Sequence, residues 1–298
     1  MSSDSFFIPG DCQDPGYRNV RDLPHLEEAH NFIESLWRRY QGYEDAHFQQ
    51  EAKDHFLERF WEMYLAATFL ERGFALSRPR NAGPEFCFTS GNQKIWVEAV
   101  APGPGIGNDR VPELQMCSEL QMGLEVASKV QTEQILLRYT NAITVKRERY
   151  LAALERGVLD DSDSYVLAIN SRGIPHAPYG NTLPFFVQAL LPFGPLTILI
   201  DPETGKFGDP FYQLRESVAK AKGSPVSTAS FLDPQFAFVS AVLHSSVDCV
   251  NCPSRLGGDF TILHNPSTSR ALDHSVFDWC EQLIYRDGAL QKVHSITL

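Results

Sequence analysis

Two glutamates lie where the sequence predicts short β-strands. Glu85 directly precedes the apolar run 86–88, and Glu98 lies inside the alternating run 95–99, a pattern typical of strands. A carboxylate among buried side chains is costly unless its charge is compensated, and a divalent cation compensates convergent acids directly. The residue types and their setting therefore predict a metal site.

The spacing along the chain favours bringing a third acid to the same place. A turn at residues 90–92 would pair the two strands as a hairpin, which sets Glu85 near Glu98. Glu62 lies 11 residues before Gly73, and a glycine there is expected to end a helix that carries Glu62. In the alternative interpretation, Glu85 is a surface strand residue and Glu98 forms an ion pair with an arginine.

This order of elements resembles the core of the PD-(D/E)XK, or restriction endonuclease-like, nuclease superfamily over residues 62–102. Its members carry an acid on a helix, a Gly/Pro-acid step on one strand and an acid-x-Lys end on the next. Glu62 resembles the helical acid, Glu85 after Pro84 resembles the first strand motif with Glu for the usual Asp, and Glu98 resembles the second strand acid.

The resemblance implies a fold, a reaction and roles for the three acids. The fold would be a three-layer α/β/α structure with a mixed sheet, and the reaction would be hydrolysis of DNA, with RNA as an alternative substrate. Glu85 and Glu98 would hold Mg²⁺ or Mn²⁺, and Glu62 would add to or orient that shell. Such a cation lowers the pKa of water and neutralises charge on the phosphate.

The sequence departs from the family pattern at Val100, which stands where these enzymes usually carry lysine. That lysine ordinarily stabilises developing charge or orients the attacking water. Relocation of the lysine to a neighbouring helix occurs in the superfamily. The competing hypothesis is a catalytically silent nuclease-like fold that serves as a binding module or as a subunit of a defence or repair assembly.

A candidate for the relocated lysine is Lys146, the one charged member of the apolar face of a helix predicted at 132–156. The other members of that face are Ile135, Tyr139, Ile143, Tyr150 and Leu154. Lys146 can extend its stem past its neighbours to water, or it can reach the acid cluster. Toward the start of the same helix, Gln134 and Arg138 are candidates to face a phosphate, as is Arg149.

Charge is distributed unevenly along the chain. The formal net charge is −11, which is the wrong sign for a protein that binds nucleic acid through a global field. Between residues 129 and 156, however, the sequence contains six basic residues and only three acids. The basic residues are Lys129, Arg138, Lys146, Arg147, Arg149 and Arg156. A phosphate-facing patch and a solvated helix face both explain this segment.

Other residues that support chemistry lack the required spacing. His244 and His264 end predicted strands, but no HxxxH, HExxH or HxH motif is present, so we interpret both as structural. Cys249 and Cys252 form a single CxxC without a second pair, which weakens a zinc or redox interpretation. The loop 102–107 is rich in glycine and proline but lacks a nucleotide-binding motif, so we expect it to lie beside a substrate.

Length and composition indicate an ordinary globular protein. The chain has 298 residues, of which 43% are apolar and 21% are charged, enough to bury a large core. The start lacks a signal-like apolar run, and six scattered cysteines favour a reducing compartment. We therefore expect a soluble cytoplasmic protein without membrane contact, for which a homodimer or larger assembly is open.

The alternation of apolar runs predicts an α/β protein of one domain at 23–298, preceded by an irregular arm at 1–22. Periodicity predicts helices at 23–40, 46–72, 112–128, 132–156, 183–191 and 275–285, of which the first two form an N-terminal helical layer. Strands beyond the hairpin are predicted at 165–170, 196–200, 236–243 and 260–264, and long loops at 171–180 and 205–225.

Overall fold

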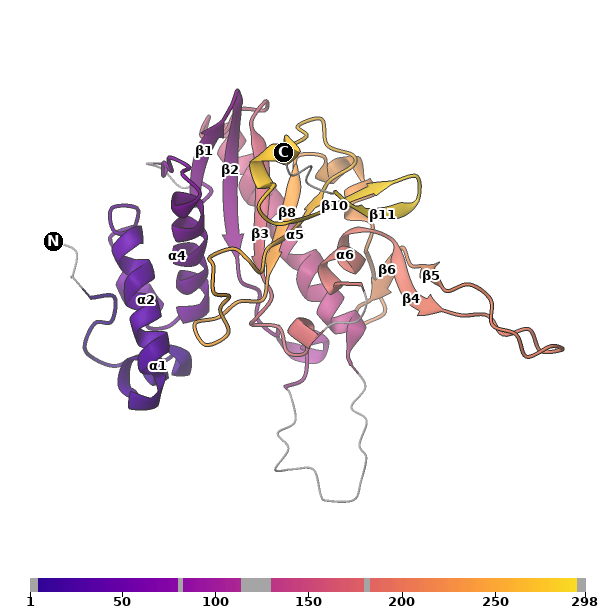
Figure 1. Ribbon diagram of the computed structural model, residues 1–298, viewed down its shortest axis with the longest axis horizontal. Coiled ribbons are helices and arrows are strands. Elements are labelled where there is room, and N and C mark those ends of the chain that lie inside the picture. Colours follow the sequence, from indigo (N-terminus) through magenta and orange to yellow (C-terminus); the bar gives the residue numbers. More distant parts are fainter. Residues whose placement is uncertain (1–4, 80–82, 114–129, 180–182, 294–298) are drawn as a thin grey trace, which may run out of the picture.

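The computed structural model describes residues 5–79, 83–113, 130–179 and 183–293. Within these residues the chain forms a mixed α/β fold around a seven-stranded sheet (Figure 1). In spatial order its strands are β1 (Phe86–Ser90), β2 (Gln93–Val100), β3 (Ser164–Asn170), β8 (Ala241–Ser245), β9 (Thr261–His264), β10 (Glu281–Arg286) and β11 (Ala289–Lys292). The predicted fold class, α/β with a mixed sheet, is confirmed.

The strand directions determine which residues meet at one end of the sheet. β1 and β2 form the predicted antiparallel hairpin, while β2, β3 and β8 run parallel to one another. β8 and β9 are antiparallel, β9 and β10 are parallel, and β10 and β11 close the sheet as an antiparallel hairpin. The carboxyl ends of β2, β3 and β8 therefore lie along one edge of the sheet, next to the start of β1.

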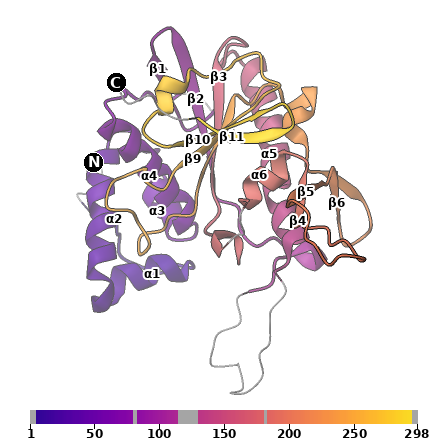
Figure 2. The ribbon, with the colours of Figure 1, turned by 45° about the vertical axis from the view of Figure 1, so that its right-hand side comes forward.

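Helices pack on both faces of this sheet (Figures 1 and 2). They are α1 (Pro15–Asp22), α2 (Glu27–Tyr40), α3 (Phe48–Ala52), α4 (Phe56–Glu71), α5 (Thr132–Glu155) and α6 (Phe185–Leu190). Alternate strand residues point to opposite faces, so Val97 belongs to the core beneath α2 and α4, whereas Trp96 belongs to the core beneath α5 and α6. The two cores share only the sheet between them.

Local sequence signals located several elements correctly. The helix predicted at 132–156 is α5, the strand at 165–170 is β3, and the helix predicted near 183–191 is α6. Gly73 follows the last turn of α4 with a φ of 85°, the left-handed conformation that favours glycine at a helix end. The helix predicted at 112–128 lies almost wholly outside the described residues.

The N-terminal segment is more regular than the sequence predicted. Residues 15–22 of the expected irregular arm form α1, and Phe6 and Tyr17 are fully buried in the core. The aspartate and proline that suggest irregular chain instead start the helix: the Asp14 carboxylate accepts from the Gly16 and Tyr17 amides, and proline occupies the first helical position.

The same aspartate accounts for a second difference. The helix predicted at 46–72 is divided into α3 and α4. At the break, the Asp14 amide donates to the carbonyl oxygen of Lys53, and the other carboxylate oxygen of Asp14 accepts from the Phe56 amide at the start of α4. A residue distant in sequence thus satisfies the backbone groups that an uninterrupted helix would have paired internally.

The C-terminal third contains the largest errors of the sequence prediction. The helix predicted at 275–285 is wrong: a short 3₁₀ turn, His274–Phe277, leads into β10, which pairs with β9. The predicted strand 236–243 begins only at Ala241, after a 3₁₀ turn at Pro234–Phe236. Pairing partners far along the chain decided both segments over local periodicity.

Two small sheets lie outside the main one. β4 (Phe193–Thr197) pairs with β5 (Phe211–Leu214), and β6 (Ser217–Ala219) pairs with β7 (Pro225–Ser227). Residues 205–225, predicted as a loop, therefore include strands, and the strand predicted at 196–200 is shifted toward Phe193. No helix in the described part of the chain combines the length and apolar character needed to cross a membrane.

Candidate functional site

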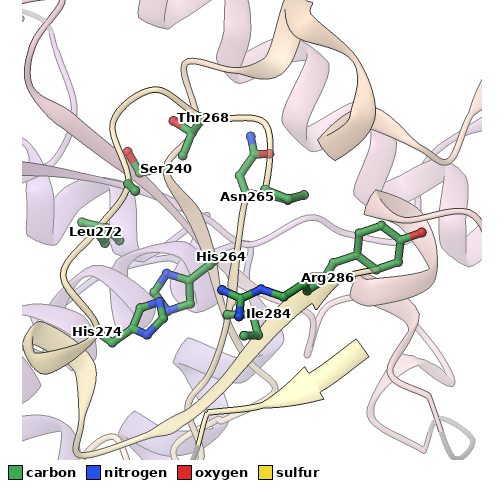
Figure 3. A pocket seen from close by; sticks show the side chains of 11 residues that line it. Ser240, His264, Asn265, Thr268, Leu272, His274, Ile284 and Arg286 are labelled. Atoms are coloured by element: carbon green, nitrogen blue, oxygen red, sulfur yellow. The ribbon is translucent and has the colours of Figure 1, made fainter. Parts of the chain in front are cut away.

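One pocket is lined by histidines (Figure 3). It has a volume of about 300 Å³ and lies where β9 and β10 end, with His264, His274 and Arg286 on its walls. His264 is buried, one ring nitrogen lies 2.8 Å from the Gln282 side-chain oxygen, and burial lowers its pKa to about 4. A neutral, hydrogen-bonded histidine is what a structural role requires.

His244 is partly buried, and its ring is also held by neighbouring side chains. One ring nitrogen lies 3.1 Å from both the Tyr139 hydroxyl and the Ser171 hydroxyl, and its ring stacks on Phe186. Burial lowers the pKa of His244 to about 3. The geometry of both histidines agrees with the structural interpretation made from the sequence.

The CxxC pair lies in the loop between β8 and β9. Cys249 is buried and Cys252 is exposed, and both are free thiols. Burial raises the pKa of Cys249 to about 12, so its thiol is protonated at neutral pH, whereas reactive cysteines require thiolate character. The geometry adds no support to a redox role.

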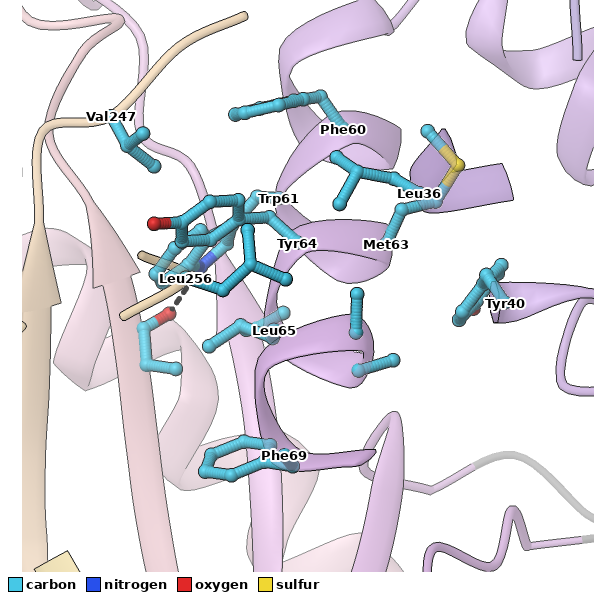
Figure 4. Close-up of a cluster of buried hydrophobic side chains, with 14 of the residues drawn as sticks. Leu36, Tyr40, Phe60, Trp61, Met63, Tyr64, Leu65, Phe69, Val247 and Leu256 are labelled. Atoms are coloured by element: carbon cyan, nitrogen blue, oxygen red, sulfur yellow. Dashed lines mark hydrogen bonds between the residues drawn. The ribbon is translucent and has the colours of Figure 1, made fainter. Parts of the chain in front are cut away.

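The acids identified from the sequence lie at the edge of the sheet where β2 ends and β1 begins. The first of them, Glu62, is positioned by α4, whose neighbouring residues anchor it to the sheet (Figure 4). Trp61 inserts between helix and sheet and donates from Nε1 to the Ala168 carbonyl oxygen at 3.0 Å. Tyr64, Leu65 and Phe69 are fully buried along the same helix, so the position of Glu62 follows from the packing of α4.

Glu62 is 4% exposed and is surrounded by cationic and hydroxyl groups. Arg59 binds its carboxylate at 2.6 Å, the Tyr40 hydroxyl donates at 3.3 Å, and Arg78 lies at 3.9 Å. Burial raises the pKa of Glu62 to about 7, although Arg59 and Arg78 act to lower it. Neither arginine was predicted from the sequence. The i,i+3 spacing of Arg59 and Glu62 on one helix was a usable signal for the first contact. No spacing in the local sequence indicates the contact between Arg78 and Glu62.

Glu85 lies directly before β1, close to Glu98 on β2. The pairing of the hairpin ends at Phe86 and Val97, so Glu85 precedes the first paired residue of β1 and Glu98 follows the last residue of β2 that pairs with β1. The pKa of Glu85 is raised well above its ordinary value, first by burial and then by the negative charges of Glu98 and Glu62. Ionising Glu85 beside these acids is therefore costly without a compensating cation.

Lys146 provides one such cation. Its ammonium donates to the carboxylate of Glu98 and, at 3.1 Å, to the carbonyl oxygen of Ala99. The side chain of Lys146 is 8% exposed and that of Glu98 is 3% exposed, so the lysine does not extend its stem to water. The interpretation that Lys146 reaches the acid cluster is correct in its geometry.

The other basic residues proposed from the sequence separate into two places along α5. Arg149 lies 3.7 Å from the Glu98 carboxylate with 67% of its side chain exposed. Arg138 is half-buried away from the acids, donates from Nε to the Gly103 carbonyl oxygen at 2.9 Å, and has a pKa lowered by burial. Gln134 lies one further turn toward the start of α5. Only Arg149 joins the site.

The acids and bases line a pocket of about 280 Å³ between α4 and α5. The charged residues on its walls are Glu58, Arg59, Glu62, Glu85, Lys146 and Arg149. Glu98 is not on these walls but lines a second pocket of about 280 Å³, and Arg149 borders both pockets. The site therefore combines buried carboxylates, one buried ammonium and a solvent-exposed guanidinium at the rim.

The side chains present fit a small oxygen-preferring cation with few protein ligands. No group of three or more His, Cys, Asp or Glu side chains in the described residues is placed to share a metal ion, and Glu62 is already bound by arginine. Mg²⁺ is commonly held by one or two carboxylates, with water and substrate phosphate completing its shell. Glu85 and Glu98 are the two acids that the sequence predicts for such an ion, and the carboxylate of Glu98 is bound by Lys146.

Comparisons of this chain with protein-family models, with curated proteins and with solved structures gave no match. The candidate functional site is the cluster formed by Glu62, Glu85, Glu98 and Lys146.

Proposed function

We propose that this protein is a Mg²⁺- or Mn²⁺-dependent phosphodiesterase that cleaves DNA, an endonuclease of the PD-(D/E)XK type. The observation that carries the proposal is the contact of Lys146 with Glu98 and Ala99. It supplies, from α5, a buried ammonium beside Val100, the position at which the family pattern expects lysine. RNA is the alternative nucleic acid.

The order of elements around this contact supports the proposal. Helix α4, the β1–β2 hairpin, α5 and the parallel strand β3 follow one another along the chain, and helices pack on both faces of the sheet. This is compatible with the three-layer α/β/α arrangement of restriction endonuclease-like folds, with α1 to α3 as an added N-terminal layer.

Each side chain has a role that its environment supports. Glu85 and Glu98 would hold the cation, which when bound lowers the pKa of water and neutralises phosphate charge. Lys146, oriented by two hydrogen bonds, stabilises negative charge that develops on the phosphate oxygens. Glu62 is bound to Arg59 and orients the pocket wall. Arg149, exposed at the rim, binds a phosphate of the DNA backbone.

The test is cleavage of plasmid DNA by purified protein with and without Mg²⁺. We expect conversion of supercoiled to nicked or linear DNA that requires the cation and is lost in Glu98→Gln. Cation-dependent cleavage of equal rate in Glu98→Gln would show that the activity comes from elsewhere, and no cleavage by the parent would count against a nuclease.

A specific observation also favours the second candidate, a silent nuclease-like fold that binds a partner in a defence or repair assembly. Lys146 neutralises Glu98 and Arg59 neutralises Glu62, so two of the three acids are balanced without any metal ion. Calorimetric titration with Mg²⁺ or Mn²⁺ separates the candidates, because a silent fold has no reason to retain affinity for the cation.

A further inference from the structure

Exposed apolar side chains are concentrated on one protruding hairpin, which we call the β4–β5 arm (residues 193–214). It extends away from the body of the protein (Figures 1 and 2), and an isolated bridge between Ile200 and Phe207 continues the pairing beyond β4 and β5. Its large apolar side chains that are exposed are Leu196, Ile198, Leu199, Ile200, Phe207, Phe211 and Leu214.

An arm of this kind lacks the contacts that normally stabilise β-structure. β4 and β5 form a two-stranded sheet whose outer edges pair with no other strand in the described residues. Isolated two-stranded hairpins are marginally stable in water, and unpaired edges together with many exposed apolar side chains mark a site of association. The arm is therefore expected to be covered in the functional protein.

We propose that the arm is covered by the arm of a second copy of this chain, with the two arms antiparallel across a twofold axis. The exposed fractions of the seven apolar residues run from 43% to 73%. With roughly 200 Å² for a fully exposed side chain of this size, they offer on the order of 800 Å² over the two faces of the hairpin together, an upper limit that is close to the contribution of each partner to a standard interface. A twofold axis makes one surface serve both partners.

The charges along the arm agree with an antiparallel arrangement. The tip carries Asp201, Glu203 and Asp209 with Lys206, all exposed and two charges negative in total. Just past the base, the turn between β6 and β7 exposes Lys220 and Lys222, and the Asp109 carboxylate, which accepts from the Ala221 amide, leaves this turn one charge positive in total. Residues 193–200 and 210–214 between these regions carry no charge. Antiparallel arms bring the acidic tip of one copy to the basic turn of the other, which selects this orientation over a parallel one.

The first test is the mass of the protein in solution, measured by analytical ultracentrifugation over a concentration series. We expect twice the 33.5 kDa chain mass. Leu199→Glu, which places a charge on a side chain that is 64% exposed, should raise the dissociation constant at least about tenfold while leaving the melting temperature of the monomer unchanged. Val250→Glu changes a residue that is 67% exposed outside the arm and should leave the mass at that of the parent.

The second test identifies the partner by exchanging charges. One variant reverses the tip with Glu203→Lys and Asp209→Lys, and the other reverses the turn with Lys220→Glu and Lys222→Glu. In a dimer of either variant alone, each tip would meet a turn of the same charge. Each variant by itself should therefore be mainly monomeric. An equimolar mixture pairs lysine tips with glutamate turns, and the parent tips with the parent turns, so the dimer should return.

A parent protein that stays monomeric up to high micromolar concentration would overturn the proposal. The same holds if that monomer binds lipid vesicles through the arm, because the arm would then be covered by lipid and not by a second copy. A dimer that survives Leu199→Glu, or a mixture of the charge variants that stays monomeric, would show that the arms do not meet as described.

Discussion

Lys146 on α5 donates hydrogen bonds to the Glu98 carboxylate and to the Ala99 carbonyl oxygen on β2. The lysine and the glutamate are 48 positions apart in the chain, and both side chains are buried. A buried charge without its partner is strongly destabilising, so each residue depends on the other. The same contact brings an ammonium to the edge of the pocket that Glu85 also lines.

The first prediction concerns Lys146→Met, which preserves the stem of the side chain and removes its charge. We expect metal-dependent DNA cleavage to fall by roughly two to three orders of magnitude, the scale for the loss of one preorganised charge stabiliser. Lys292→Met, on an exposed lysine of β11, is the control and should cleave like the parent. Undiminished cleavage by Lys146→Met would remove this lysine from the mechanism.

A second prediction follows from the mutual dependence of the buried pair. Lys146→Met leaves Glu98 with the exposed Arg149 as its one ion-pair partner among the described residues, so the free energy of unfolding should fall by about 3–5 kcal/mol. Adding Glu98→Gln removes the unpaired charge and should restore most of that loss. Urea unfolding of both single variants and the double variant measures the coupling; additive losses would contradict the pairing.

The third prediction separates activity from stability at Glu85. Burial and two neighbouring acids raise the pKa of Glu85, so its ionisation opposes folding at neutral pH. Glu85→Gln should therefore abolish metal-dependent cleavage while raising the melting temperature at pH 8. The Glu148→Gln variant, on an exposed acid of α5, should change neither. A less stable Glu85→Gln protein would show that the carboxylate is compensated in the folded state.

The fourth prediction is a pH dependence of stability that arises from Glu62. Its pKa is raised from 4.5 to about 7, so between these values the folded state binds more protons than the unfolded state. The stabilisation is fully present below pH 4.5 and is lost as the pH rises through 7. Glu62→Gln should reduce the fall in unfolding free energy across this window. If the free energy of unfolding of that variant still falls with pH as steeply as that of the parent, another group is responsible for the pH dependence.

The fifth prediction distinguishes the two arginines of α5 that the sequence proposed for phosphate binding. Arg149→Ala should weaken DNA binding and reduce the slope of log affinity against log salt by about one, because one fewer counterion is released. Arg138→Ala should leave that slope unchanged and lower stability, since Arg138 holds the Gly103 carbonyl oxygen. Fluorescence anisotropy across a salt series measures the DNA affinity and its salt dependence for both variants. An unchanged slope for Arg149→Ala would show that the exposed face of α5 contacts solvent and not DNA.

Several parts of this arrangement follow from local chemistry. The β1–β2 hairpin needs only two alternating strands and a short turn, and its last pair, Phe86 with Val97, brings the neighbouring Glu85 and Glu98 close together. The left-handed Gly73 closes α4 because glycine carries no Cβ. The stripe of α5 that carries Lys146 follows from helical periodicity alone.

Other parts depend on partners that the local sequence does not name. The strand β10 was predicted as a helix because its periodicity suits either form, and its pairing with β9 decided the outcome. Asp14 divides a predicted helix through contacts with Lys53 and Phe56, about 40 residues away. Non-local hydrogen bonds supply free energy that a sequence window does not contain.

The amino-acid sequence by itself determined the residue types of the site, the hairpin that brings Glu85 near Glu98, and the helix face that carries Lys146. Only the tertiary structure decided that Lys146 contacts Glu98 while Glu62 is bound by Arg59 and Arg78. The physical reason is that the charge state and partners of a buried group depend on what other elements bring within hydrogen-bonding distance. That distance is set by the packing of α4 and α5 against opposite faces of the sheet.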